Sequence, residues 1–122
     1  MPGTGKRILI FEDNINISLL LRTYFERNRY EVRLAEDGVD AVSLAKDFGP
    51  HLILMDIIMP GKGGLEAVSD LRREGVTAPI VMLTSKSYEE DRKRALEAGA
   101  NAFILKPFSP KKLEEVITPL LT

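Results

Sequence analysis

HLILMDIIMP (residues 51–60) places an acid at the end of an apolar run. Residues 52–55 have the composition of a strand buried on both faces. Asp56 follows them directly, and Pro60 closes the run after three more apolar residues. An ionised carboxylate is costly to keep in apolar surroundings, so Asp56 requires a compensating group nearby. The residues that could supply this group indicate both the fold and the function.

The chain has 122 residues, enough for one domain with a hydrophobic core. Its 44% of apolar residues is typical of a soluble globular protein. We therefore expect a single domain over residues 1–122, with a flexible N-terminus over residues 1–5. No apolar run is long enough to cross a bilayer, and the start lacks the pattern of a secretory signal. The expected location is the cytoplasm, which the absence of Cys also fits.

Composition excludes several kinds of site. Without Cys there are no disulfides, thiolate nucleophiles or Cys-based metal sites. His51 is the one histidine, so a multi-His metal site is excluded as well, and we assign it no role. The net charge of −1 creates no overall field that would attract the chain to nucleic acid. We expect no direct contact with nucleic acid or membrane.

Five apolar runs alternate with five stretches of helical spacing, which predicts an α/β fold with a doubly wound parallel sheet covered on both faces. The crossovers between strands should be right-handed. The expected strands cover residues 6–11, 31–35, 52–55, 79–84 and 102–105. Four expected helices have apolar stripes, between Ile17 and Phe25, Ala41 and Phe48, Leu65 and Leu71, and Leu113 and Leu120; the other should start at Ser87 and end at Gly99.

Two of these helices carry a specific start signal. Ser87 and Glu90 have the spacing of a capping box. Ser109 precedes Pro110, which suits an N-cap followed by the first helical position. Both helices should therefore begin at these serines.

Acids follow two of the predicted strands. In an open parallel sheet, ligands bind beyond the carboxyl ends of the strands. Glu12–Asp13 follows the first strand and Asp56 ends the third. If these strands are neighbours, three carboxylates share one pocket, where they repel one another unless a cation is present. Oxygen ligands on a shallow surface suit Mg²⁺, which would hold Asp13 and Asp56 ionised together.

Two further groups follow the fourth and fifth strands. Lys106 would add a fixed positive charge, and the Thr84 hydroxyl could donate a hydrogen bond. A carboxylate beside Mg²⁺ and a lysine can attack a phosphoryl group, because the cations neutralise the transferring oxygens. The product would be an aspartyl phosphate on Asp56.

Together these residues resemble the receiver domain of two-component response regulators, the CheY-like family, along nearly the whole chain. The resemblance implies a flavodoxin-like three-layer sandwich with strand order 2-1-3-4-5. The motifs that carry it are Glu12–Asp13, Asp56 within DIIMPGKGG, Thr84–Ser85 and Lys106–Pro107.

The resemblance also implies the chemistry of the site. Asp56 would accept a phosphoryl group from a phosphohistidine on a sensor histidine kinase or phosphotransfer protein. Asp13 and Asp56 would bind Mg²⁺ directly together with the backbone carbonyl of Ile58, and Glu12 would bind it through water. Such a protein is not a conventional enzyme. Self-phosphorylation from a phosphodonor with Mg²⁺, and slow autodephosphorylation, would be its only reactions.

The switch residues likewise come from the resemblance. Lys106 would pair with the phosphate, Thr84 would move toward it, and Phe103 would turn inward. The Lys106–Pro107 bond is expected to be cis. The face made by the fourth helix, fifth strand and fifth helix would then change its affinity for a downstream effector protein or domain. A phosphorylation-dependent dimer is an open alternative.

The chain departs from the family pattern at two places. Gly61-Lys62-Gly63-Gly64 stands where family members often have Met and Asp before the last Gly. We expect this loop to be more flexible and more basic than usual. Phe103 lacks the hydroxyl of the Tyr that is also common at its position. Neither departure touches the phosphorylation chemistry.

Three other functions stay open. A metal-dependent phosphatase would also use an aspartyl intermediate, but Ile58 stands where such enzymes usually carry a second acid. A flavin carrier on the same fold would need a phosphate loop after the first strand, where residues 12–17 instead begin with two acids. A degenerate receiver would bind partners without phosphorylation. Taken singly, Asp56 could also be a turn residue and Phe103 a core aromatic.

Overall fold

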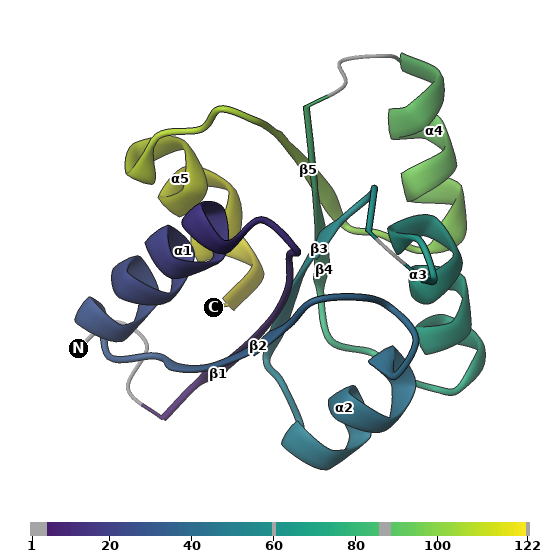
Figure 1. Ribbon diagram of the computed structural model, residues 1–122, viewed down its shortest axis with the longest axis horizontal. Coiled ribbons are helices and arrows are strands. Elements are labelled where there is room, and N and C mark those ends of the chain that lie inside the picture. The colour runs from purple at the N-terminus through teal and green to yellow at the C-terminus, as the bar shows by residue number, and fades with distance from the viewer. Residues whose placement is uncertain (1–4, 60, 86–88, 122) are drawn as a thin grey trace.

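The computed structural model is a parallel sheet with helices on both faces (Figure 1). It describes residues 5–59, 61–85 and 89–121. Within these residues the sheet has five strands in the order β2-β1-β3-β4-β5, which confirms the predicted α/β class and strand order. The strands are β1 (Arg7–Phe11), β2 (Glu31–Ala35), β3 (Leu52–Asp56), β4 (Ile80–Thr84) and β5 (Ala102–Leu105), and the helices are α1 (Ile15–Arg27), α2 (Ala41–Phe48), α3 (Gly64–Arg73), α4 (Glu89–Ala98) and α5 (Pro110–Leu121).

Alternation along the strands divides the core into two halves. In β1, Ile8 and Ile10 face one side and Leu9 and Phe11 face the other, because successive strand residues point to opposite faces. The first pair packs with α1 and α5, and the second packs with α2, α3 and α4. The result is the expected three-layer sandwich (Figure 1).

The register of the central strands brings their carboxyl ends together. Phe11 pairs with Met55, so the next residues, Glu12 and Asp56, end adjacent strands. Every residue of β3 and β4 is buried, including Asp56 and Thr84, the last residue of each strand. The sheet therefore collects polar groups at one edge of an otherwise apolar core.

Helix α1 begins earlier than its apolar stripe predicts. Asn14 caps it, since its side-chain oxygen accepts hydrogen bonds from the amides of Asn16 (2.9 Å) and Ile17 (3.1 Å). Leu20, which belongs to the apolar stripe, is 54% exposed, whereas Leu21 and Phe25 are buried. The helix thus buries a narrower arc than its sequence suggests.

The cap of α5 matches its start signal: the Ser109 hydroxyl accepts a hydrogen bond from the amide of Lys112 at 3.1 Å, as predicted. The capping box of Ser87 and Glu90 lies outside the described residues, and so does nearly all of the start expected to be flexible. Among the described residues, the helices are too short or too polar to traverse a membrane.

Candidate functional site

The polar groups at the sheet edge form an acidic cluster. Carboxylate oxygens of Glu12, Asp13 and Asp56 lie within 4.8 Å of one another. Glu12 and Asp56 are buried and Asp13 is exposed, so the cluster opens to solvent on one side. The three acids that the sequence predicts to share a pocket do so.

Asp56 is held by groups from two directions. Its Oδ1 accepts a hydrogen bond from the backbone amide of Ile58 at 3.3 Å. Its Oδ2 accepts one from the Lys106 ammonium at 3.1 Å. Asp56 is only 7% exposed, so this lysine is the compensating cation that its burial requires.

Glu12 is buried more deeply. Its Oε2 accepts a hydrogen bond from the Asn14 amide at 3.2 Å, and its Oε1 lies 2.6 Å from the Lys106 ammonium, without the geometry of a hydrogen bond. Burial raises the pKa of Glu12, and the neighbouring Asp56 adds to the increase, while Lys106 and the Asn14 amide oppose it. One ammonium therefore serves two buried carboxylates, which leaves the cluster short of positive charge.

Lys106 keeps its charge in spite of burial. Burial lowers its pKa, but the close carboxylates of Glu12 and Asp56 outweigh this effect, and the pKa lies above its ordinary value. The Lys106–Pro107 peptide bond is cis, the geometry that the resemblance implies. The lysine is thus a fixed cation at the edge of the site.

Gly64, which sequence reasoning left without a role, packs directly against the site. A Cβ atom at this position would lie 2.1 Å from the carbonyl oxygen of Asp56, so only glycine fits. The Gly64 amide donates to the carbonyl of Ile57 at 2.8 Å. The glycine-rich stretch of residues 61–64 indicates a close approach of the backbone, but the sequence does not show which of its glycines packs against β3.

Thr84 and Phe103 occupy different surroundings. Thr84 is buried at the end of β4, and its pairing with Leu105 sets it beside the strand end that precedes Lys106. Phe103 is half-buried in β5, packs against the core and lines a surface groove. The structure therefore places Thr84 at the edge that bears the acids and Phe103 on the groove.

This arrangement agrees with a comparison to known families. Residues 8–118 match the response regulator receiver domain. The chain belongs to that family. The receiver domain is 38% identical over 118 residues to the chemotaxis protein CheY of Halobacterium salinarum, covering 97% of this chain and 98% of that protein. It is 43% identical over 111 residues to the phosphate regulon transcriptional regulatory protein PhoB of Escherichia coli, covering 89% of this chain. The receiver domain spans about half the length of PhoB, 48%.

Solved receiver structures agree. CheY4 of Vibrio cholerae has a TM-score of 0.89 at 29% identity and covers 95% of this chain and 98% of its own. The receiver domain of the sensor histidine kinase PA1611 of Pseudomonas aeruginosa has a TM-score of 0.86 at 30% identity, covers 95% of this chain and 97% of its own, and has a magnesium ion coordinated in its active site cleft.

The acids of this receiver domain fit the same cation. Their donors are all oxygens, which a small hard ion such as Mg²⁺ prefers. The buried Oε1 of Glu12 lacks a hydrogen bond, and the cluster is short of positive charge. A divalent ion would remedy both.

Proposed function

We propose that residues 1–122 act as one receiver domain whose Asp56 accepts a phosphoryl group from a phosphohistidine on a sensor histidine kinase or phosphotransfer protein. The observation that carries this proposal is the pairing of a buried Asp56 with Lys106 at 3.1 Å beside two further acids. A buried carboxylate beside a fixed cation, in a cluster open to solvent through Asp13, is a suitable nucleophile.

The proposed metal site would draw on the three acids whose oxygens lie within 4.8 Å of one another. Asp13 and Asp56 would hold Mg²⁺ directly with the backbone carbonyl of Ile58, and Glu12 would hold it through water. When bound, Mg²⁺ supplies positive charge to the oxygens of the transferring group. The fit rests on the oxygen donor set of the three acids.

The transfer step is a displacement at phosphorus. An oxygen of Asp56 forms the new bond to phosphorus, the bond from phosphorus to the histidine nitrogen breaks, and its electron pair stays on that nitrogen. Lys106 lies where it can pair with a phosphoryl oxygen on Asp56. Acetyl phosphate would serve as a small donor in the same way, with acetate leaving. Autodephosphorylation would be slow, because the exposed Ile58 offers no acid to activate water.

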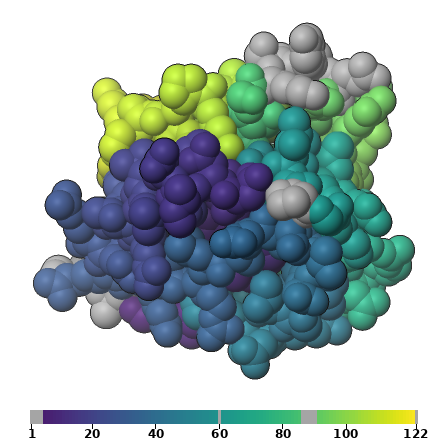
Figure 2. Space-filling model, in the orientation of Figure 1, coloured from purple at the N-terminus to yellow at the C-terminus, as the bar shows by residue number. Residues whose placement is uncertain are grey.

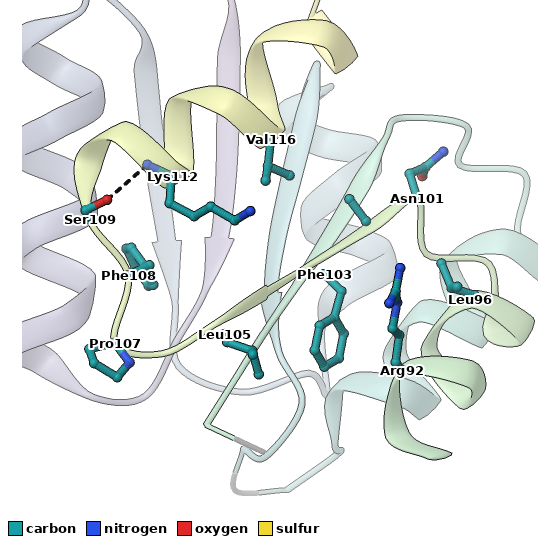
Figure 3. A pocket seen from close by; sticks show the side chains of 11 residues that line it. Arg92, Leu96, Asn101, Phe103, Leu105, Pro107, Phe108, Ser109, Lys112 and Val116 are labelled. Atoms are coloured by element: carbon teal, nitrogen blue, oxygen red, sulfur yellow. Dashed lines mark hydrogen bonds between the residues drawn. The ribbon is translucent and has the colours of Figure 1, made fainter. Parts of the chain in front are cut away.

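The output surface lies on the other side of β5. A groove of about 820 Å³ runs between α4 and α5 over β5 (Figure 3). Phosphorylation would draw Thr84 toward the phosphate and Phe103 inward, which changes the shape of this groove. A downstream effector protein or domain would recognise the change, and a phosphorylation-dependent dimer through the same face is the alternative readout. The lining residues are Arg92, Leu96, Asn101, Ala102, Phe103, Leu105, Pro107, Phe108, Ser109, Lys112 and Val116.

Mass spectrometry tests the proposal. The protein is incubated with acetyl phosphate and Mg²⁺, and its intact mass is measured. We expect a gain of one phosphoryl group that chelation of Mg²⁺ prevents and that Asp56→Asn abolishes. A gain that persists in Asp56→Asn would place the acceptor elsewhere, and no gain in the wild type would favour the degenerate receiver.

A further inference from the structure

The glycine stretch before α3, residues 61–64, contains few side chains that can fix its shape. Residues 61–64 are three glycines and Lys62, so Lys62 alone has a side chain. Gly61 has a φ of 73°, a conformation that glycine reaches without cost. Because glycine has the largest backbone freedom, this stretch loses more entropy on folding than an ordinary loop of the same length. Some contact must hold it in place.

The start of α3 does not supply that contact. Gly63 is its N-cap residue, and no side chain caps the helix there. An Asn, Asp, Ser or Thr at this position would bind the first amides of the helix and fix the entering chain. In this receiver domain that means of holding the loop to the helix is missing.

Lys62 provides a different connection. Its ammonium forms an ion pair with Asp70, inside α3, and Asp70 also pairs with Arg73 (both contacts are direct). The backbone carbonyl of Lys62 accepts a hydrogen bond from the Gly38 amide at 3.2 Å. The one side chain of the glycine stretch thus joins the loop to α3, while its backbone joins the loop to the segment before α2.

This ion pair is better shielded than others on the surface. The side chains of Lys62 and Asp70 are 30% and 16% exposed. By contrast, Lys46 in α2 and Glu74 at the C-cap of α3 are about half exposed, and their charged groups are 3.5 Å apart. The hydrogen bond between Lys62 and Asp70 raises the pKa of the lysine and lowers that of the aspartate, as expected for a pair that stays charged. Exposed pairs contribute little, so the contrast with Lys46–Glu74 is informative.

We propose that the Lys62–Asp70 ion pair is a positioning pair for the Mg²⁺ site. It holds the loop whose Ile58 carbonyl is the third protein ligand, so this inference rests on the proposed function. A backbone hydrogen bond from the Gly64 amide to the Ile57 carbonyl joins the two ends of the loop. The Lys62 side chain adds a second connection, to Asp70 in α3. Without the Lys62 side chain, residues 61–64 keep their backbone hydrogen bonds alone, so the stretch rearranges more readily and the Ile58 carbonyl leaves its place more often.

Substitution of Lys62 separates positioning from simple electrostatics. Lys62→Met removes a positive charge from the domain, which by itself would favour the binding of a cation. Loss of positioning weakens it instead. Groups that orient a metal ligand typically contribute about 10- to 100-fold in affinity, and we expect about tenfold weaker Mg²⁺ binding in Lys62→Met and in Asp70→Asn. Calorimetric titration with Mg²⁺ measures both.

Three controls complete the experiment. Lys46→Met removes the lysine of the exposed pair between α2 and the C-cap of α3, and it should leave the Mg²⁺ affinity unchanged. Lys62→Arg keeps the charge and should restore most of the affinity. Amide hydrogen exchange without Mg²⁺ should be faster over residues 57–64 in Lys62→Met and Asp70→Asn, and unchanged in Lys46→Met. The urea midpoints of all folded variants are compared to detect a general loss of stability.

The outcomes distinguish this inference from the proposed function. Mg²⁺ binding that Asp13→Asn abolishes but Lys62→Met leaves equal or tighter would overturn the inference and leave the metal site standing. An equal loss of affinity in Lys46→Met would also overturn it. If Asp13→Asn left Mg²⁺ binding intact, the proposed site itself would be wrong.

Discussion

The Lys106 ammonium lies 3.1 Å from Asp56 Oδ2, although 50 residues separate them in the chain. Their strands, β3 and β5, are not neighbours, since β4 lies between them. The side chain of Lys106 therefore reaches across the end of β4 to the acids.

Lys106→Met should separate metal binding from phosphoryl transfer. Removing the cation leaves the acids more negative, so Mg²⁺ should bind more tightly. Phosphorylation by acetyl phosphate should slow by about 100-fold, because one fixed donor to the transferring oxygens is lost. Calorimetry and a time course of intact mass measure the two effects. Lys111→Met, at an exposed position of α5, is the control and should change neither. Weaker Mg²⁺ binding in Lys106→Met would contradict the charge balance described here.

Gly64→Ala tests the close approach of α3 to β3. The new methyl group would meet the Asp56 carbonyl at 2.1 Å, so helix or strand must shift. We expect the free energy of unfolding to fall by about 1–3 kcal/mol, with weaker Mg²⁺ binding because Asp56 moves. Gly63→Ala is the matched control, since its methyl group finds ordinary contact at 3.5 Å, and it should change stability by less than about 0.5 kcal/mol. Urea unfolding provides the values, and equal effects of the two substitutions would refute the steric argument.

The acid cluster could be predicted from sequence because its geometry follows from topology alone. Glu12 and Asp56 each follow an apolar run, and parallel neighbours end at the same edge. Lys106 and Thr84 end later strands in the same way. Nothing about their side-chain contacts was needed to bring them to one edge.

The features that escaped prediction depend on contacts between elements. Asn14 follows two acids, and any of the three could cap a helix, so only the observed hydrogen bonds single it out. The pairing of Lys62 with Asp70 spans eight residues from a loop to a helix, a spacing with no helical or strand period. Leu20 matches the apolar period of α1, yet α1 packs through the neighbouring Leu21 and Phe25 instead.

His51 offers a direct test of the start of β3. The Arg7 amide donates to its Nδ1 at 3.0 Å, which requires a neutral ring. Burial, followed by the positive charges of Arg7 and Lys6, lowers the pKa of His51 below 6.5. The depressed pKa means that the unfolded chain binds the proton more readily. Stability from this group is thus present above the unfolded pKa and is lost as the pH falls through the folded value.

The expected result is one imidazole signal in a proton NMR titration, because the chain has one histidine, with a midpoint below 6.5. His51→Gln should also flatten the fall in the urea midpoint between about pH 7 and pH 5. A midpoint at or above 6.5 would show that the Arg7 amide does not hold the neutral ring.

Arg72 tests whether the amino ends of β4 and β5 can be weakened without disturbing the metal site at the carboxyl ends of the strands. Its guanidinium donates from Nε to the Gly99 carbonyl (2.9 Å), from Nη1 to the carbonyls of Val76 (2.8 Å) and Ala78 (2.9 Å), and from Nη2 to Asn101 Oδ1 (2.8 Å). Arg72→Met leaves these acceptors without their donor, so the free energy of unfolding should fall by about 2–4 kcal/mol. Arg72→Lys should recover only part of this loss, because one ammonium cannot reproduce the planar fork.

The matched control for Arg72→Met is Arg22→Met, which breaks an exposed pair with Glu26 at 3.4 Å and should change stability by less than about 0.5 kcal/mol. Arg72 binds Ala78 and Asn101, just before β4 and β5 begin, whereas Asp56 lies where β3 ends. The Mg²⁺ affinity of folded Arg72→Met should therefore stay within about twofold of wild type. Urea unfolding and calorimetry measure the two quantities on the same samples. If Mg²⁺ affinity fell together with stability, the two edges would be coupled through α3, and the independence of the acid cluster from the rest of the sheet would be disproved.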